Sequence, residues 1–111
     1  MKKTKVVVVY GESGCGKTTY VKNHIQENDI VYDYDALFSA ISFRPEKTTA
    51  RDCQFQILMD FRRIFLINMQ RSGADTAYVI VVDPEKIKKY LPIDAEYVRP
   101  RRGEKDGNQT E

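Results

Sequence analysis

The sequence lacks any hydrophobic run long enough to cross a bilayer. Its apolar runs at residues 6–10 and 78–82 are short, whereas a transmembrane helix needs about 20 predominantly apolar residues. The N-terminus also lacks the long apolar stretch of a secretory signal. These absences predict a cytoplasmic protein that makes no contact with a membrane.

Cysteine and net charge are also scarce. The chain has two cysteines, Cys15 and Cys53, and a formal net charge of only +2. Because a cytosol keeps thiols reduced, we expect both thiols to be free. The nearly balanced charge does not by itself predict nucleic-acid binding. Much of the positive excess lies near the two ends of the chain, in Lys2, Lys3, Lys5, Arg99, Arg101 and Arg102.

The sequence contains no internal repeat and no linker, and its 111 residues fit one small domain. With 41% apolar and 31% charged residues, the composition is that of an ordinary globular protein. We expect residues 1–100 to form this domain. Residues 101–111 are polar and have no apolar anchor, which predicts a disordered C-terminal tail.

Short apolar segments alternate with helical patterns along the chain. Buried strands are predicted at residues 6–10, 30–32 and 77–82, and an edge strand at 96–99. Helices are predicted at residues 17–27, 36–43, 52–71 and 84–90. This alternation predicts an α/β fold, a three-layer α/β/α sandwich around a small, mostly parallel sheet. On the longest helix, six apolar residues are predicted to share one buried stripe: Ile57, Leu58, Phe61, Ile64, Phe65 and Met69.

Residues 11–18 read GESGCGKT and match the phosphate-loop pattern G-x-x-x-x-G-K-[ST] at every fixed position. The predicted strand before them and helix after them supply the context that this pattern requires. Glycines allow positive φ, so that backbone N–H groups at the helix N-terminus can cradle phosphate oxygens. Lys17 is expected to reach the β- and γ-phosphates, and the Thr18 hydroxyl to bind Mg²⁺.

The loop therefore predicts a nucleoside triphosphate site with Mg²⁺. The residues expected to line it are Gly11, Glu12, Ser13, Gly14, Cys15, Gly16, Lys17, Thr18 and Thr19. We expect the Glu12 carboxylate to point to solvent, away from the phosphates. Cys15 is either a reactive thiolate, favoured by the helix N-terminus and Lys17, or a small residue that fits the loop.

Three aspartates follow predicted strands, at the edge where open parallel sheets bind ligands. Asp83 follows the third strand, where a carboxylate can hold Mg²⁺, but it also precedes Pro84 as a helix N-cap would. Asp33 and Asp35 follow the second strand. Asp35 either caps the helix predicted at Ala36 or accepts a proton from a substrate hydroxyl.

The segments GESGCGKTTYVKNH and DIVYDYDALFSAI together resemble the small P-loop kinases of the polynucleotide-kinase and zeta-toxin type, including short ATP-binding proteins of phage genomes. The resemblance covers about residues 5–41. It implies a reduced P-loop NTPase fold, ATP and Mg²⁺ as ligands, and γ-phosphoryl transfer to a hydroxyl of nucleic acid or of a small molecule. It also implies that Lys17 and Thr18 bind phosphate and Mg²⁺. The general base that it implies is Asp35, with Asp33 as the second candidate.

The chain departs from that family after Asp83, where it has no evident arginine-bearing lid or final strand-helix pair. Arg99, Arg101 and Arg102 are candidates for a reduced lid, and a partner protein or second copy is the alternative source of an arginine. Three further arginines either serve an acceptor pocket or are solvated charges on a helix: Arg51, Arg62 and Arg63.

Two other functions are compatible with the sequence. A shortened kinase domain can act as a nucleotide-dependent binding or regulatory module that hydrolyses ATP slowly or not at all. The basic ends and five tyrosines are compatible with single-stranded nucleic-acid binding, although packing accounts for most of these rings: Tyr32, Tyr34, Tyr78, Tyr90 and Tyr97.

Overall fold

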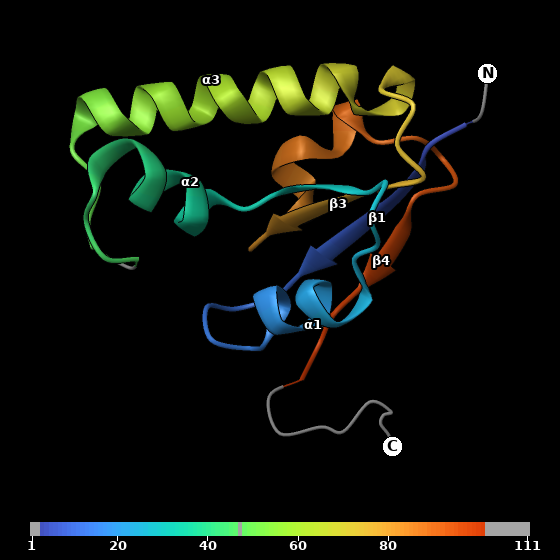
Figure 1. The fold of residues 1–111 in the computed structure, drawn as a ribbon, viewed down its shortest axis with the longest axis horizontal. Coiled ribbons are helices and arrows are strands. Elements are labelled where there is room, and N and C mark those ends of the chain that lie inside the picture. Colours follow the sequence, from blue (N-terminus) through green and yellow to red (C-terminus); the bar gives the residue numbers. More distant parts are fainter. Residues whose placement is uncertain (1–2, 47, 102–111) are drawn as a thin grey trace.

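Four parallel strands form one sheet in the computed structural model, which describes residues 3–46 and 48–101. They are β1 (Lys5–Tyr10), β2 (Ile30–Tyr32), β3 (Thr76–Val81) and β4 (Glu96–Val98). The strand order is β2-β3-β1-β4, and every neighbouring pair is parallel (Figure 1). The predicted α/β class, the parallel sheet and the edge position of the last strand are confirmed.

Three α-helices and two 3-10 helices occur in the described part of the chain. The α-helices are α1 (Lys17–His24), α2 (Tyr34–Ser42) and α3 (Asp52–Asn68). The 3-10 helices are η1 (Met69–Arg71), which extends α3, and η2 (Pro84–Tyr90). The first helix is shorter than the predicted 17–27, because Ile25 adopts an extended conformation with ψ of 137°.

Helix α2 starts two residues before the predicted position because Asp33, and not Asp35, is its N-cap. The Asp33 side chain accepts hydrogen bonds from the backbone N–H groups of Asp35 and Ala36. The interpretation of Asp35 as the cap is therefore wrong. The helix ends at Ser42, one residue before the predicted end at Phe43, and its C-cap Phe43 has a left-handed φ of 58°.

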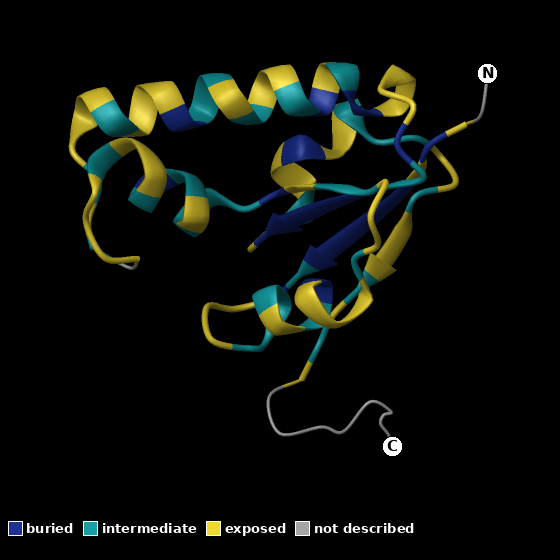
Figure 2. Cartoon of the chain, in the orientation of Figure 1, coloured by how far each residue is buried: buried dark blue, intermediate teal, exposed yellow. Residues whose placement is uncertain are grey.

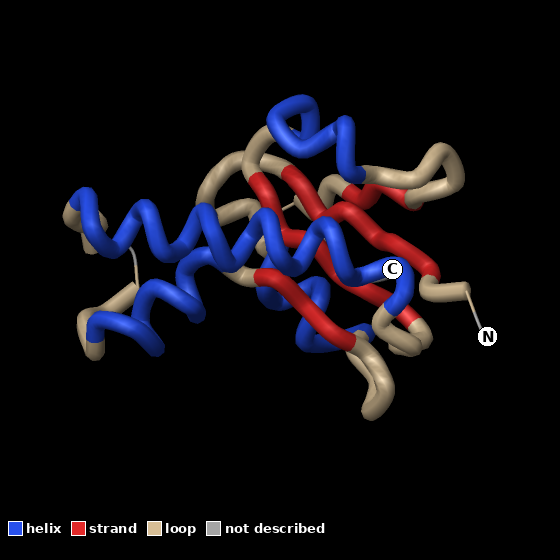
Figure 3. Tube along the Cα trace, turned by 90° about the horizontal axis from the view of Figure 1, so that it is seen from above, coloured by secondary structure: helices blue, strands red, loops and turns tan. Residues whose placement is uncertain are grey.

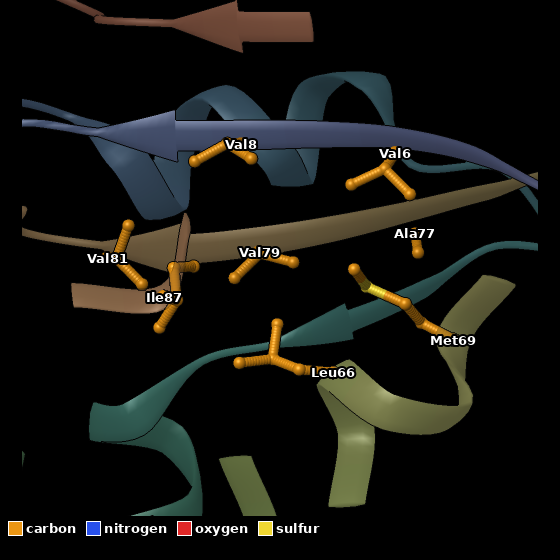
Figure 4. Close-up of a cluster of buried hydrophobic side chains, with 8 residues drawn as sticks. All are labelled: Val6, Val8, Leu66, Met69, Ala77, Val79, Val81 and Ile87. Carbon is orange, nitrogen blue, oxygen red and sulfur yellow. The ribbon is translucent and has the colours of Figure 1, made fainter. Parts of the chain in front are cut away.

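The two central strands, β1 and β3, are buried on both faces of the sheet, whereas the edge strands β2 and β4 are more exposed. On one face, Val7 and Val9 of β1 pack with Val21 of α1. On the other face, strand residues pack against helices that come later in the chain, as Figure 4 shows for Val6, Val8, Ala77, Val79, Val81, Leu66, Met69 and Ile87. Helix α1 thus covers one face, and α3, η1 and η2 cover the other (Figure 1).

Only one side of α3 is buried, so the predicted stripe is partly wrong. Leu58 and Met69 are buried, as predicted, and Leu66 is also buried at 1% exposure. Ile57, Phe61 and Ile64 are not: they are 47%, 42% and 57% exposed. Figure 2 shows the outer surface of α3 as largely exposed. The predicted stripe included residues from two sides of α3. Within the described part of the chain, only one of these sides is covered.

The α2–α3 pair extends beyond the carboxyl ends of the strands (Figures 1 and 3). None of the helices in residues 3–46 and 48–101 is both long and apolar enough to span a membrane. The tail predicted at residues 101–111 lies outside the described residues except for Arg101.

Candidate functional site

A cleft of about 1310 Å³ lies at the carboxyl ends of the strands. The loop after β1 forms one wall, the ends of β2 and β3 form the floor, and α2 and α3 supply the wall beyond them. Residues 13–19 line the cleft, whereas Gly11 is buried and Glu12 is exposed, as expected. The predicted phosphate loop therefore opens into this cleft.

The loop glycines adopt the conformations for which glycine is needed. Gly11, Gly14 and Gly16 have φ of 137°, 84° and 98°, all in the region that other residues rarely occupy. Gly16 is the N-cap of α1 and has no side chain to compete for the first N–H groups of the helix. Those N–H groups are available to an anion in the loop.

The Lys17 side chain folds back onto the loop. Its Nζ donates hydrogen bonds to the backbone oxygens of Gly11, at 2.6 Å, and Glu12, at 2.9 Å. These bonds hold the ammonium group within the loop.

Arg99 lies against the start of the loop because β4, which precedes it, pairs with β1. A Cβ atom added to Gly11 would lie 2.8 Å from Cys15 Sγ and 3.5 Å from Arg99 Cγ. Arg99 and Arg101 both line the cleft, and Arg102 lies outside the described residues. Both cysteines are free, as predicted.

Thr18 contacts Asp33, the second candidate for the general base. The Thr18 hydroxyl donates to Asp33 Oδ2 at 3.3 Å, while Asp33 Oδ1 accepts from the backbone N–H groups of Asp35 and Ala36 at 3.1 and 3.5 Å. Both Asp33 oxygens are thus engaged. Asp35 also lines the cleft, and its carboxylate accepts no hydrogen bond from residues 3–46 or 48–101.

Asp83 lines the same cleft from the end of β3. Its Oδ1 accepts a hydrogen bond from Glu85 N at 3.0 Å, so the N-cap interpretation is confirmed. The described residues contain no group of three or more His, Cys, Asp or Glu side chains that would hold a metal without a further ligand. Thr18, Asp33 and Asp83 instead supply a few oxygen atoms around one cleft.

The α3 wall contains two residues that the sequence did not predict for the site, Phe55 and Met59, together with Arg62. Their spacing of four and three residues places them on one side of a helix, a signal that was present in the sequence. The other two candidate arginines do not line this cleft. Arg51 is exposed at the start of α3, and Arg63 donates to Asp60 at 2.8 Å.

Tyr32 fixes the end of β2 to α3. The ring is buried, at 2% exposure, and its hydroxyl donates to Leu58 O at 3.1 Å. Burial raises the pKa of Tyr32 from 10.0 to about 12, against a smaller lowering by the Arg62 charge. Tyr32 and Tyr78 are both buried, so neither ring is available to stack on a nucleic-acid base.

No family model, curated protein or solved structure matches this chain. The resemblance of residues 5–41 to small kinases therefore rests on the motif residues themselves. Of those residues, Lys17, Thr18 and Asp35 line one cleft.

Proposed function

We propose that this chain is a small P-loop kinase that transfers the γ-phosphoryl group of ATP to a hydroxyl acceptor. The observation that carries the proposal is the loop at residues 11–18, with positive φ at its three glycines, opening into a cleft with Thr18, Asp33 and Asp35. Helices on both faces of the parallel sheet support a three-layer, reduced P-loop NTPase fold. ATP, rather than GTP, is proposed from the family resemblance.

The loop and Lys17 would hold the phosphates. The first N–H groups of α1 would donate to phosphate oxygens, and the Lys17 ammonium would exchange its two backbone carbonyl partners for phosphate oxygens. Arg99, which lies against Gly11, would add a second positive charge from within the chain. This position favours Arg99 over a partner protein as the source of the lid arginine.

The oxygen atoms at the cleft suit Mg²⁺. This ion is usually bound by one or two carboxylates together with substrate phosphates and waters. The residues that would hold Mg²⁺ are Thr18 and Asp83, as the sequence predicts, together with Asp33, which contacts Thr18. When bound, Mg²⁺ supplies charge neutralisation at the phosphates.

Asp35 is proposed as the general base. The acceptor oxygen forms a bond to the γ-phosphorus, the bond from that phosphorus to the bridging oxygen breaks, and ADP leaves. The proton of the acceptor hydroxyl goes to the Asp35 carboxylate. Asp35 suits this role better than Asp33 because Asp33 already accepts hydrogen bonds at both oxygens.

Calorimetry of MgATP binding tests the nucleotide site. Lys17→Ala removes charge-assisted hydrogen bonds of about 1.5–3 kcal/mol, so affinity should fall by roughly tenfold or more. The matched control is Lys22→Ala, which removes an exposed lysine from the last turn of the same helix and should leave affinity unchanged. Unaltered affinity in Lys17→Ala would overturn the proposed site.

Transfer is tested with labelled ATP, Mg²⁺ and a panel of 5′-hydroxyl oligonucleotides, nucleosides and sugars. Label should pass to an acceptor, and Asp35→Asn should lose this transfer while it keeps its affinity for ATP. Unchanged turnover in that variant would remove Asp35 from the mechanism. Tight ATP binding with label found only in free phosphate, or not released at all, would instead favour the nucleotide-dependent binding module.

A further inference from the structure

Apolar side chains form a stripe along the outer side of α3, here called the outer stripe. Ile57, Phe61, Ile64 and Ile67 are 47%, 42%, 57% and 53% exposed. Their spacing of three or four residues places them on one side of a helix. Helix α3 runs along one margin of the molecule, and no described segment lies outside it (Figures 1 and 3). The outer stripe is therefore accessible along its whole length.

Packing within the chain does not account for the outer stripe. A surface helix of a globular protein needs one apolar side, and α3 already buries Leu58 and Leu66 on its opposite side. Contiguous exposed apolar surface usually marks a place where another protein, a membrane or a ligand binds. The charged residues beside the outer stripe distinguish between these partners.

The charges of α3 and η1 change sign along the outer stripe. Asp52 and Asp60 lie toward its start, and Arg63 and Arg71 toward its end. At about 3.6 residues per turn, these charged residues fall on the same side of the midline of the stripe. The remaining charge, Arg62, lines the cleft instead. The residues that border the stripe on its other side are uncharged: Gln54, Phe65 and Asn68.

This pattern complements itself when two copies of α3 lie antiparallel. A two-fold axis brings one border of the stripe against the same border of the second copy, with its direction reversed. An axis near the middle of α3 would set the following residues opposite each other: Asp52 and Arg71, Asp60 and Arg63, Ile57 and Ile67, and Phe61 and Ile64. A parallel arrangement would instead bring the charged border against the uncharged one. A membrane surface suits the stripe less well, because helices that bind it have polar faces rich in Lys and Arg.

The bonds that these charged groups make within the chain leave them open to a second copy. Asp60 and Arg63 form an ion pair at 2.8 Å, but their side chains are 51% and 54% exposed, and exposed pairs contribute little to stability. Arg71 donates to Asn68 Oδ1 and has further N–H donors. In the antiparallel pair, each of these groups would gain an opposite charge from the other copy.

We propose that the outer stripe binds the outer stripe of a second copy of this chain, with the two α3 helices antiparallel. Helix α3 has 17 residues, so the contact would be about 25 Å long and 10 Å wide. This is smaller than the roughly 800 Å² that each partner buries in a standard interface. The dimer should therefore be reversible. The cleft lies on another side of α3 and would stay open, so the inference does not depend on the proposed kinase function.

Sedimentation equilibrium of the full chain tests the association. Concentrations from about 1 to 300 μM cover the range expected for a small interface, and the wild type should pass from monomer to dimer within it. Ile64→Glu should raise the dissociation constant by about tenfold or more. The matched control is Ile93→Glu, which changes a fully exposed isoleucine between η2 and β4 and should leave the constant unchanged. Thermal unfolding of each variant identifies any loss of folded protein.

A charge exchange and a cross-link test the orientation. Arg63→Glu should weaken the dimer by placing two carboxylates opposite each other, and Asp60→Arg combined with Arg63→Glu should restore it. After mild oxidation, Arg71→Cys should form a disulfide between position 71 of one copy and Cys53 of the other, since both lie at opposite ends of the stripe. The wild type should form few Cys53–Cys53 links, and peptide mapping identifies which positions are joined.

The outcomes decide the proposal. A dimer weakened by Ile64→Glu and not by Ile93→Glu, with links between position 71 and Cys53, supports it. A wild type that stays monomeric throughout the concentration range overturns it and leaves the outer stripe to a different protein. Equal association of Ile64→Glu and the wild type also overturns it, because the dimer would then use another surface. Links mainly between Cys53 and Cys53 would show that the helices are parallel, which contradicts the proposed pairing.

Discussion

Replacing Gly11 by alanine tests the geometry of the phosphate loop most directly. Gly11 has φ of 137°, and an added Cβ would lie 2.8 Å from Cys15 Sγ. Holding a residue other than glycine in such a conformation costs roughly 1–3 kcal/mol. Moving the Cys15 side chain away from its preferred rotamer adds about 0.5–1.5 kcal/mol. We therefore expect Gly11→Ala to lower the free energy of unfolding and to weaken MgATP binding.

Two further variants separate these contributions. Gly73→Ala introduces a side chain at φ of 86° with no atom within 4 Å, so it should show the backbone cost alone and bind MgATP normally. Cys15→Ala in the Gly11→Ala background removes the Sγ contact and should recover the steric part but not the backbone part. All variants are compared by urea unfolding and by calorimetry of MgATP binding.

The reasoning is refuted if Gly11→Ala unfolds at the same urea concentration as the wild type and binds MgATP equally well. It is also refuted if the Cys15→Ala change restores no stability, because the added methyl group would then not meet the sulfur atom. Equal loss of MgATP affinity in Gly73→Ala would show that the effect comes from general destabilisation rather than from the loop.

Two predictions concern α3 and its contact with the sheet. Leu66→Ala should lower the free energy of unfolding by about 2–5 kcal/mol. Ile64→Ala, at a position 57% exposed, should change it by about 0.5 kcal/mol or less. Similar urea midpoints for the two variants would mean that α3 is rotated relative to this structure. Tyr32→Phe should cost about 1 kcal/mol at neutral pH through loss of the bond to Leu58 O. Because burial raises the Tyr32 pKa to about 12, the stability from its neutral phenol is complete below pH 10 and is lost as the pH rises to 12. The wild type should therefore lose stability across this window more steeply than Tyr32→Phe, and parallel curves from urea titrations at each pH would contradict the assignment.

The features that depend on local chemistry were predictable from the sequence. The strand at residues 30–32 and the start of α1 at Lys17 agree with the structure, because β-branched runs and glycine turns act over a few residues. The positive φ at Gly11 and Gly16 follows from the loop motif in the same way. The N-cap role of Asp83 also needed only the residues next to it.

The features that depend on packing between distant segments were not predictable. Asp33 and Asp35 are two residues apart, and which of them contacts Thr18 depends on where α2 begins. Likewise, Ile57 and Leu58 are both apolar, but only the position of α3 over the sheet decides that Leu58 is the buried one. The contribution of Phe55 and Met59 to the cleft required the placement of α3 past the strand ends.

The strand order also bears on how the chain reaches this structure. Val8, at the middle of the first strand, pairs with Val79 and Tyr97, and no described segment close to it in sequence joins it in the sheet. Contacts of such large sequence separation form slowly, because the long loops between them must close first. We therefore expect β1 to keep both edges open until β3 and β4 have been synthesised and have docked. The phosphate loop, which comes directly after β1, would then acquire its shape late in folding.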